Sequence, residues 1–267
     1  MEDKLNNLRK YIRDLGSIAV GFSGGVDSTF LLAVAAEELG DKVIAVTDVG
    51  SFVPKREIRE AEEFCRERGI RHYKAEFDPL SDENCAGNPP DRCYHCKKHV
   101  FGEVIRIASE QGIEYVAEGS NMDDLGDYRP GLKAVSELKI VSPLRTAELH
   151  KREIRELSKM MGLPTWNKPS YACLASRFVY GEQITAEKLK MVDEAEQYLI
   201  EKGFTEERVR IHGNLARIEV PAADIEKLAD RDIREDIYNE LKKIGCLYVT
   251  LDLGGYRTGS MNEALPG

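Results

Sequence analysis

The fold of this chain is decided by one stretch, Val20-Gly21-Phe22-Ser23-Gly24-Gly25-Val26-Asp27-Ser28. Its apolar residues end at a serine and two glycines, and a helical pattern begins directly afterwards, which predicts a strand, a tight turn and a helix. Adjacent glycines let backbone N–H groups approach a ligand closely, and a helix N-terminus favours negative charge. We therefore predict that residues 23–28 bind phosphate, with an ordinary glycine turn as the alternative.

Outward from this stretch, apolar runs alternate with helical patterns. The sequence predicts strands at 18–22, 42–47, 70–77, 115–118 and 139–141, and helices at 3–15, 28–39, 54–68, 95–111 and 148–161. Consecutive strands that are joined through helices pair in parallel. We therefore expect an α/β fold with a doubly wound parallel sheet.

The pattern changes towards the C-terminus. The helical period disappears between residues 162 and 180, where 163–170 predict an extended linker. Beyond it we expect a helix, two strands, a helix and a strand, at 185–202, 209–213, 215–220, 222–244 and 247–253. This order suggests a smaller α+β domain of ferredoxin-like type without its first strand. The predicted domains are residues 1–180 and 181–267.

The composition limits the partners and the compartment. The 267 residues carry a net charge of −9, and the isoelectric point is near 5.3, so bulk binding of nucleic acid is disfavoured. No apolar run approaches the roughly 18 residues of a membrane span, and the charged N-terminus lacks the pattern of a signal peptide. We expect a cytoplasmic protein without a membrane partner.

Polar loops follow two of the predicted strands. In doubly wound sheets the ligand lies beyond the carboxyl ends of the strands. Thr47 and Asp48 end the second strand, and Gly119 follows the fourth, so we expect a bound nucleotide to contact them, with adenosine against residues 47–49. The alternative for each loop taken alone is a solvated turn.

Three of the six cysteines lie in polar surroundings. Cys93 and Cys96 have Cys-x-x-Cys spacing at the start of a predicted helix, and Cys173 lies in a later irregular segment. In a reducing compartment such cysteines are thiols or metal ligands rather than disulfides. Three thiolates can hold a [4Fe–4S] cluster and leave one iron open, whereas structural zinc would need a fourth ligand, for which His95 or His99 is available.

The segment around Cys173 also allows an interpretation without a metal. Cys173 would then be a reactive thiol, with Ser176 and Arg177 binding a phosphate beside it. The remaining alternative is that the cysteines pack as small apolar side chains, which we expect for Cys65 and Cys246.

Residues 23–28 have the form S-G-G-x-D-S. This form resembles the pyrophosphate loop of ATP-pyrophosphatases, which cleave ATP between the α and β phosphates and adenylate a substrate. The P-loop of kinase-like ATPases does not match, because its spacing and its lysine are absent. Further motifs make nearly the whole chain resemble the LarE family: Gly119-Ser120-Asn121, Tyr128-Arg129-Pro130-Gly131, Pro143-Leu144 and Pro169-Ser170-Tyr171-Ala172-Cys173-Leu174-Ala175-Ser176-Arg177.

The resemblance implies a function. LarE proteins are ATP-dependent sulfur transferases that adenylate pyridinium-3,5-biscarboxylic acid mononucleotide and install sulfur, on the way to the nickel-pincer nucleotide cofactor. ATP and Mg²⁺ are the implied cofactors, and the mononucleotide is the implied small-molecule partner. Sulfide or a sulfur-donor protein would be a further partner, and homo-oligomerisation stays open.

The resemblance also assigns the reacting groups. Asp27 and Ser28 would act on the phosphates, and Cys173 matches the cysteine that in some members gives up its own sulfur and becomes dehydroalanine. That mechanism has no need of Cys93 and Cys96. We therefore predict a [4Fe–4S] cluster on all three cysteines, which would pass on an extra sulfide.

In the second domain, the resemblance marks a phosphate- and metal-binding region. Arg208 and Arg210 alternate on one predicted strand, and Glu219 lies on the next. We expect the two arginines, with Ser176 and Arg177, to bind substrate phosphate and Glu219 to bind a metal ion. A solvated strand face is the alternative.

Two other functions remain as alternatives. Related ATP-pyrophosphatases that thiolate tRNA carry similar three-cysteine clusters, although this acidic chain lacks their zinc-ribbon cysteine pairs. A non-catalytic nucleotide sensor could keep the same loop, but it would have no use for the cysteines.

Overall fold

The structure is a computed structural model that describes residues 1–126, 130–169, 171–257 and 259. It divides into two compact units. The first comprises Met1–Asp78 and Asp91–Tyr171, and the second comprises Pro79–Pro90 and the described part of Ala172–Gly267. The chain therefore passes between the units three times. The predicted boundary after residue 180 stays a prediction, and Tyr128, Arg129 and Ser170 of the quoted motifs lie outside the described residues.

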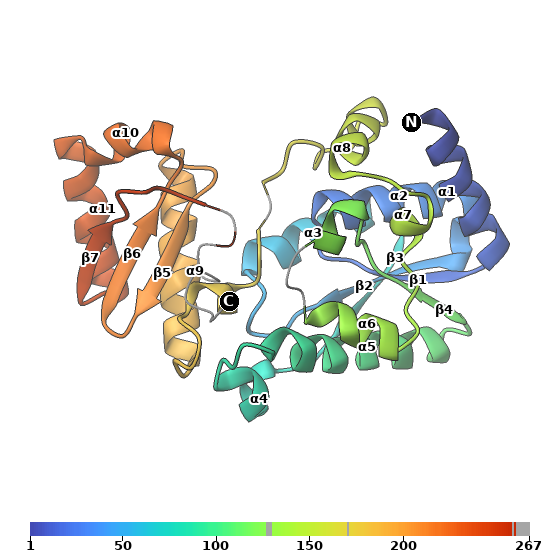
Figure 1. Cartoon of the computed structure of the whole chain (residues 1–267), viewed down its shortest axis with the longest axis horizontal. Helices are drawn as coiled ribbons and strands as arrows, with labels where there is room; N and C mark the ends of the chain where they lie inside the picture. The colour runs from blue at the N-terminus through green and yellow to red at the C-terminus, as the bar shows by residue number, and fades with distance from the viewer. Residues whose placement is uncertain (127–129, 170, 258, 260–267) are drawn as a thin grey trace. The chain divides into compact units, whose positions relative to one another are not determined.

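The first unit contains a four-stranded parallel sheet (Figure 1). Its strands are β1 (Ile18–Gly21), β2 (Val43–Asp48), β3 (Arg71–Ala75) and β4 (Tyr115–Ala117), in the order β3-β2-β1-β4. The prediction of an α/β fold with a parallel sheet is confirmed. Since β1 lies between β2 and β4, the strand order reverses beside β1, where doubly wound sheets bind their ligands.

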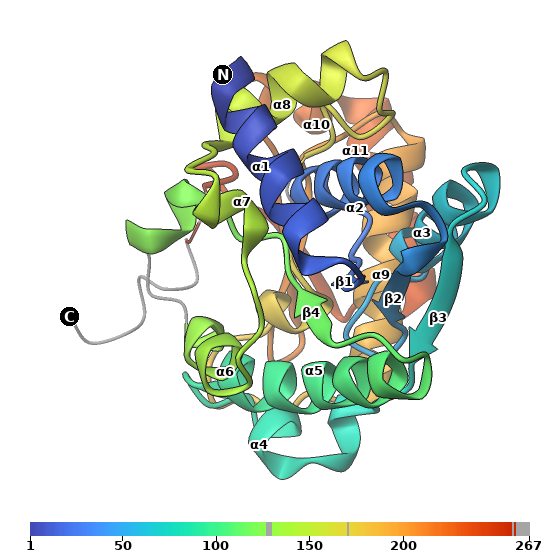
Figure 2. The ribbon, with the colours of Figure 1, turned by 90° about the vertical axis from the view of Figure 1, so that its right-hand side faces the viewer.

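Helices cover both faces of this sheet, as Figure 2 shows. Neighbouring residues of β1 point to opposite faces, and both faces are buried: Val20 belongs to an apolar cluster with residues of α1, α2, α3 and α8, whereas Ala19 belongs to one with residues of α5 and α6. Burial on both faces explains the nearly continuous apolar sequences of β1 and β2, whereas the edge strand β3 is largely polar. The helices are α1 (Glu2–Leu15), α2 (Val26–Leu39), α3 (Lys55–Glu67), α5 (Arg92–Glu110), α6 (Gly131–Glu137), α7 (Pro143–Thr146) and α8 (Lys151–Met160).

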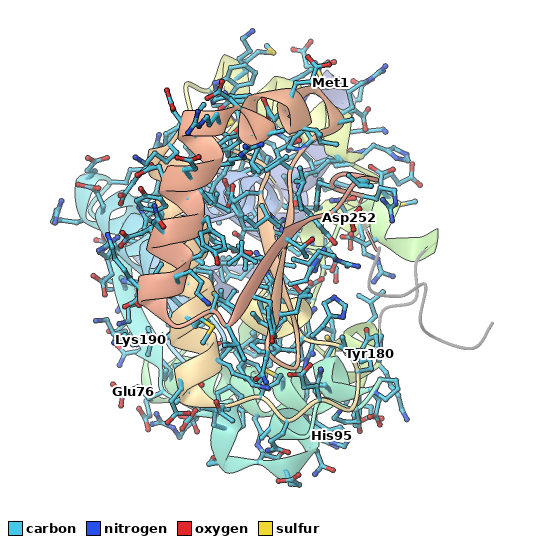
Figure 3. The ribbon with its side chains drawn as sticks, turned by 90° about the vertical axis from the view of Figure 1, so that its left-hand side faces the viewer. Met1, Glu76, His95, Tyr180, Lys190 and Asp252 are labelled. Atoms are coloured by element: carbon cyan, nitrogen blue, oxygen red, sulfur yellow. The ribbon has the colours of Figure 1, made fainter. Side chains whose placement is uncertain are left out.

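The second unit has a three-stranded sheet in the order β5-β6-β7. Its strands are β5 (Arg208–His212), β6 (Leu215–Glu219) and β7 (Tyr248–Leu251); β5 and β6 form an antiparallel hairpin, and β7 pairs in parallel with β6. Helices α9 (Ala186–Glu201) and α11 (Arg231–Ile244) pack side by side next to these strands (Figure 3). This order of elements agrees with the predicted α+β pattern.

The second unit also contains the segment Pro79–Pro90 with the short helix α4 (Glu83–Ala86). The buried Asn88 side chain donates to the carbonyl oxygens of Phe178 and Val179 at 3.3 and 2.7 Å. The amide of Ile184 donates to the carbonyl of Ala86 at 2.8 Å. These bonds attach a segment from the first third of the chain to the part that follows residue 171.

Three local predictions differ from the structure. The predicted strand 139–141 is reduced to a bridge between Val141 and Ala117, because the turn that ends α6 includes its first residues: Lys139 has a φ of +55°, and the amide of Ile140 donates to the carbonyl of Val135 at 3.0 Å. The predicted helix 222–244 is divided into α10 (Ile225–Ala229) and α11, because the Asp230 side chain caps a new helix N-terminus. In the described part of the predicted linker, residues 164–167 form turns rather than extended chain.

Within the described residues, no helix has the length and apolar character that crossing a membrane requires.

Candidate active site

The predicted phosphate-binding loop joins β1 to α2 at the carboxyl edge of the parallel sheet. Gly24 has a φ of +69°, a backbone conformation that favours glycine. Gly25 is the N-cap of the 14-residue helix α2. The first N–H groups of such a helix have no partner within the helix, so they are available to an anion.

Hydroxyl groups gather in the same loop. The Oγ atoms of Ser23 and Ser28 lie 3.0 Å apart. The N–H of Gly25 donates to Ser23 Oγ at 3.4 Å, and Ser28 Oγ donates to the Gly25 carbonyl at 3.2 Å. The structure therefore brings Ser23, Gly25 and Ser28 together as a compact set of hydrogen-bonding groups at a helix N-terminus.

The Asp27 side chain has two partners from distant parts of the chain. Asn121 Nδ2 donates to Asp27 Oδ1 at 3.2 Å, and Lys151 Nζ forms a hydrogen-bonded ion pair with Asp27 Oδ2. No specific signal in the sequence marked Lys151, which is a basic residue in the first turn of the predicted helix 148–161 and the first residue of the observed α8. Its neighbour His150 bonds Asp123 at 2.7 Å, which fixes the start of α8 beside the loop after β4.

Gly119 lies against the start of α2. A Cβ atom at Gly119 would be 3.0 Å from the backbone nitrogen of Ser28, a contact closer than side chains normally make. Glycine at this position therefore lets the loop after β4 approach the phosphate-binding loop. The structure brings Gly119 and Ser28 together, as expected for neighbouring carboxyl ends of parallel strands.

The end of β2 carries Thr47 and Asp48. The Thr47 hydroxyl donates to the Phe22 carbonyl at 2.9 Å, and His72 Nε2 lies 2.8 Å from the same hydroxyl, which ties β2 to the residue before the loop. Burial raises the pKa of Asp48 from its ordinary value of 3.8 to about 6, although the N–H of Gly50 partly opposes this. Asp48 is thus a half-buried carboxyl beside the expected adenosine site.

In the second unit, Arg177 is buried rather than exposed to a ligand. Its Nε and Nη2 atoms donate to the two oxygens of Glu196 at 2.8 and 2.9 Å, and neither side chain is accessible to solvent. Its Nη1 atom donates to the carbonyl oxygens of Ala172 and Cys173 at 2.6 and 3.1 Å. These contacts hold the backbone of the Cys173 segment, and the predicted phosphate contact of Arg177 stays a prediction.

The other predicted residues of this unit form one buried charged cluster. Arg210 donates to Glu219 at 3.0 Å and to the carbonyl of Ser176 at 2.8 Å. Arg217 donates to the other oxygen of Glu219 at 2.9 Å. Arg208, also buried, stacks over the ring of Tyr256. The structure thus brings Ser176, Arg177, Arg208, Arg210 and Glu219 together, and Glu219 is held by arginines.

The six cysteines are all described, and none is in a disulfide. Cys93 and Cys96 are half-buried in the first turns of α5, where a spacing of three residues places them on one face of the helix. Cys173 is exposed and belongs to the second unit. Among the described residues, no group of three or more His, Cys, Asp and Glu side chains is arranged to hold a metal ion.

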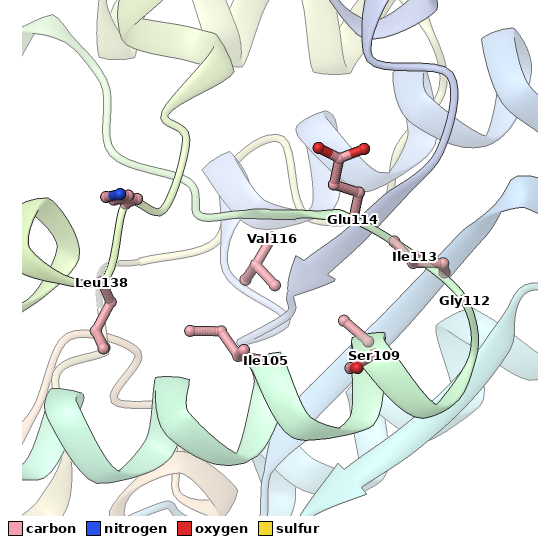
Figure 4. Close-up of a pocket in the computed structure, with 9 residues that line it drawn as sticks. Ile105, Ser109, Gly112, Ile113, Glu114, Val116 and Leu138 are labelled. Atoms are coloured by element: carbon pink, nitrogen blue, oxygen red, sulfur yellow. The ribbon is translucent and has the colours of Figure 1, made fainter.

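A cavity of about 530 Å³ lies elsewhere, at the amino end of β4. In Figure 4, Ile105, Val116 and Leu138 point into one space, whereas Glu114 points away. Because Glu114 precedes β4 and Gly119 follows it, this cavity is at the opposite edge of the sheet from the phosphate-binding loop. It is not part of the candidate site.

The parallel sheet, the S-G-G-x-D-S loop and the polar groups at its carboxyl edge define an ATP-pyrophosphatase with a pyrophosphate loop. The model of the NAD synthase family agrees, because it matches residues 1–86, which include this loop. More specifically, the chain belongs to the LarE family of ATP-dependent sulfurtransferases.

Family membership follows from similarity over almost the full length. The pyridinium-3,5-bisthiocarboxylic acid mononucleotide synthase of Lactiplantibacillus plantarum is 39% identical over 95% of this chain and 92% of its own. An uncharacterised protein of Synechocystis is 40% identical over 99% of both chains. One component of the glutamine-hydrolysing GMP synthase of Pyrococcus abyssi is 32% identical over 73% of this chain and 67% of its own, which shows that the similarity extends beyond the family.

Proposed function

We propose that this protein uses ATP to activate a carboxylate of pyridinium-3,5-biscarboxylic acid mononucleotide and then replaces an oxygen of that carboxylate with sulfur. The observation that carries the proposal is the set of polar groups from Ser23, Gly25, Asp27 and Ser28 where the strand order reverses. The name of the Lactiplantibacillus relative supports the sulfur-containing product. We further propose a cytoplasmic enzyme supplied by sulfide or a sulfur-donor protein.

Activation is needed because a carboxylate has no good leaving group. An oxygen of the substrate carboxylate attacks the α-phosphorus of ATP, the bond from that phosphorus to the bridging oxygen breaks, and pyrophosphate leaves. The N–H groups and hydroxyls of residues 23–28 would stabilise the charge that develops on pyrophosphate. Mg²⁺ would supply further positive charge when bound, and Asp27 would keep Lys151 and Asn121 beside the phosphates.

Sulfur transfer follows on the acyl adenylate. A thiolate attacks the carboxyl carbon, the new C–S bond forms, and the C–O bond to AMP breaks, so AMP leaves with the electron pair. If the sulfur is that of Cys173, a proton must leave its Cα atom while the Cβ–S bond breaks, and dehydroalanine remains. The buried Arg177 would hold this segment in place, and Arg208 and Arg210 would bind the substrate phosphate.

For the source of sulfur, we propose the alternative in which Cys173 is not consumed. Cys93, Cys96 and Cys173 would hold a [4Fe–4S] cluster, since thiolates are its usual ligands and the first two lie on one helix face. When bound, such a cluster has one iron without a protein ligand and can supply an extra sulfide. Cys173 would then survive the reaction.

The adenylation half is tested by pyrophosphate release. The protein is incubated with ATP, Mg²⁺ and the mononucleotide, and pyrophosphate is assayed for the native chain and for Asp27→Asn. We expect release by the native chain and a loss of roughly 100-fold or more in the variant, with the same circular dichroism spectrum as the native chain at the assay temperature. Tight ATP binding without pyrophosphate release would instead indicate a nucleotide sensor.

The sulfur half is tested by the fate of Cys173. The protein is purified without oxygen, and its iron and acid-labile sulfide are measured. After turnover, the mass of the peptide that contains Cys173 is measured by mass spectrometry. We expect iron, sulfide and an intact Cys173. A protein without iron whose Cys173 has become dehydroalanine would establish the sacrificial mechanism, and bound zinc would make the Cys-x-x-Cys pair structural.

A further inference from the structure

Lys168 lies near the end of the first unit along the chain and contacts the phosphate-binding loop. Its Nζ atom donates to the Gly24 carbonyl at 3.0 Å. It also donates to Glu57 Oε2 at 2.7 Å and to Glu60 Oε2 at 2.6 Å, both from α3. An ammonium group has three donor hydrogens, and three acceptors surround it here.

The position of Lys168 is fixed on both sides. Arg155 of α8 donates to the carbonyls of Trp166 and Lys168, each at 2.9 Å, so the turns after α8 are tied to that helix. The Lys168 side chain is only 12% exposed. Its partner Glu57 is equally buried, with 9% of the side chain exposed. A lysine held in this way presents its charge to the Gly24 carbonyl and to the two carboxylates, and not to solvent.

The contact has a geometric consequence for the next peptide group. In a trans peptide the carbonyl and the N–H point in opposite directions, and the described chain has no cis bond. The carbonyl of Gly24 faces Lys168, so the N–H of Gly25 faces the other side. On that side it meets Ser23 Oγ, which lies 3.0 Å from Ser28 Oγ. Gly24 needs such support, because glycine has the widest choice of backbone conformations.

We propose that Lys168 is a positioning residue for the pyrophosphate loop: by binding the Gly24 carbonyl, it holds the Gly25 N–H towards the phosphates. The proposal rests on the proposed function, because it assumes that residues 23–28 bind pyrophosphate. Glu57 and Glu60 hold the ammonium group in place. Without it, the Gly24–Gly25 peptide can rotate, and one donor of the loop is no longer directed at the anion.

The test measures the binding of inorganic pyrophosphate with Mg²⁺ by calorimetry, so it needs neither ATP nor the mononucleotide. The full chain is compared with Lys168→Met, Lys168→Arg and the control Lys159→Met, which changes a lysine on α8 that stacks on Trp166. We expect Lys168→Met to weaken binding about tenfold or more, Lys168→Arg to restore most of it, and Lys159→Met to leave it unchanged.

A second readout follows the peptide itself. In protein labelled with ¹⁵N-glycine, the Gly25 amide signal, assigned with Gly25→Ala, should shift in Lys168→Met and return in Lys168→Arg. Unchanged pyrophosphate affinity together with an unchanged Gly25 signal would overturn the proposal. If the native chain binds no pyrophosphate, the proposed function fails, while the Gly25 signal still decides the role of Lys168. Should Lys168→Met not fold, Lys168→Gln, whose amide is too short to reach Gly24, takes its place.

Discussion

Asp48 lies in the expected nucleotide site, in an environment that is unfavourable for its ionised carboxylate. Its pKa is raised by burial from 3.8 to about 6, so ionisation is harder in the folded chain than in the unfolded one. Below pH 3.8 both states hold the proton, and the carboxyl costs nothing. As the pH rises to about 6 the unfolded state is increasingly favoured, and above this value the full cost of roughly 3 kcal/mol is present.

We therefore predict that Asp48→Asn stabilises the protein at pH 8 but not at pH 4. Asparagine can still accept the hydrogen bond from Gly50, and it carries no charge to bury. The measurement is urea unfolding of both proteins at the two pH values. Asp41→Asn, at an exposed residue near the other end of β2, is the matched control and should change little. A constant difference between Asp48→Asn and the native chain at both pH values would contradict the prediction.

At the level of single residues, only part of the candidate site could be predicted from the sequence. Residues 23–28 were recognisable because glycines, hydroxyls and a helix start follow one another along the chain. Lys151 and Lys168 were not, because each bonds the loop from more than 120 residues away. Nothing in the local pattern of a lysine shows which distant carboxylate or carbonyl it will meet. Burial was equally hidden: Arg177 stands in a polar motif and yet has no accessible surface.

Among the elements, α9 and the short helix η4 (Leu174–Arg177) depend on one ion pair. Arg177 and Glu196 are both fully buried, and the amide of Val209 at the start of β5 also donates to Glu196, at 3.0 Å. Removing one partner of a buried pair leaves the other charge without compensation, which typically costs about 3–5 kcal/mol. The pair therefore joins η4, α9 and β5 into one cooperative structure.

We predict that Arg177→Met lowers the free energy of unfolding by about 3–5 kcal/mol, and that Arg177→Met with Glu196→Met recovers much of the loss. Both are measured by urea unfolding. Lys190→Met, which breaks an exposed pair with Glu194 on the same helix, should change stability by less than about 1 kcal/mol. If Arg177→Met unfolds like the native chain but binds the mononucleotide more weakly, the phosphate-binding prediction holds instead.

Most elements could be predicted because their signals are local. The parallel strands β1 and β2 are visible in the sequence as apolar runs, and the ends of the helices were often marked by glycine, as at Gly16 and Gly40. The wrong predictions occurred where a local contact overrides the periodic pattern: the Asp230 side chain starts a new helix inside a helical pattern, and the turn that ends α6 takes up residues 139 and 140. Neither effect changes the spacing of the apolar residues, from which helices and strands are predicted.

For the whole molecule, the segment Pro79–Pro90 was the least predictable part. It follows β3 and precedes α5 of the first unit, but it belongs to the second. Its position in the sequence, between β3 and α5, favours the first unit. It belongs to the second unit because of hydrogen bonds such as those from Asn88 to the carbonyl oxygens of Phe178 and Val179. Domain limits drawn as two consecutive ranges cannot represent such an arrangement.

This interlaced path predicts how the protein would behave after a single cut. If a protease site is inserted between Tyr171 and Ala172, the larger fragment keeps residues 79–90, which are hydrogen-bonded to residues of the smaller one. The two fragments should therefore co-elute in native buffer and separate in urea, and Asn88→Ala should weaken their association. Separation in native buffer would contradict this. A chimaera that exchanges the residues after 171 between relatives would accordingly need to exchange residues 79–90 as well. Recombination at a single junction would pair residues 79–90 of one relative with the C-terminal segment of another.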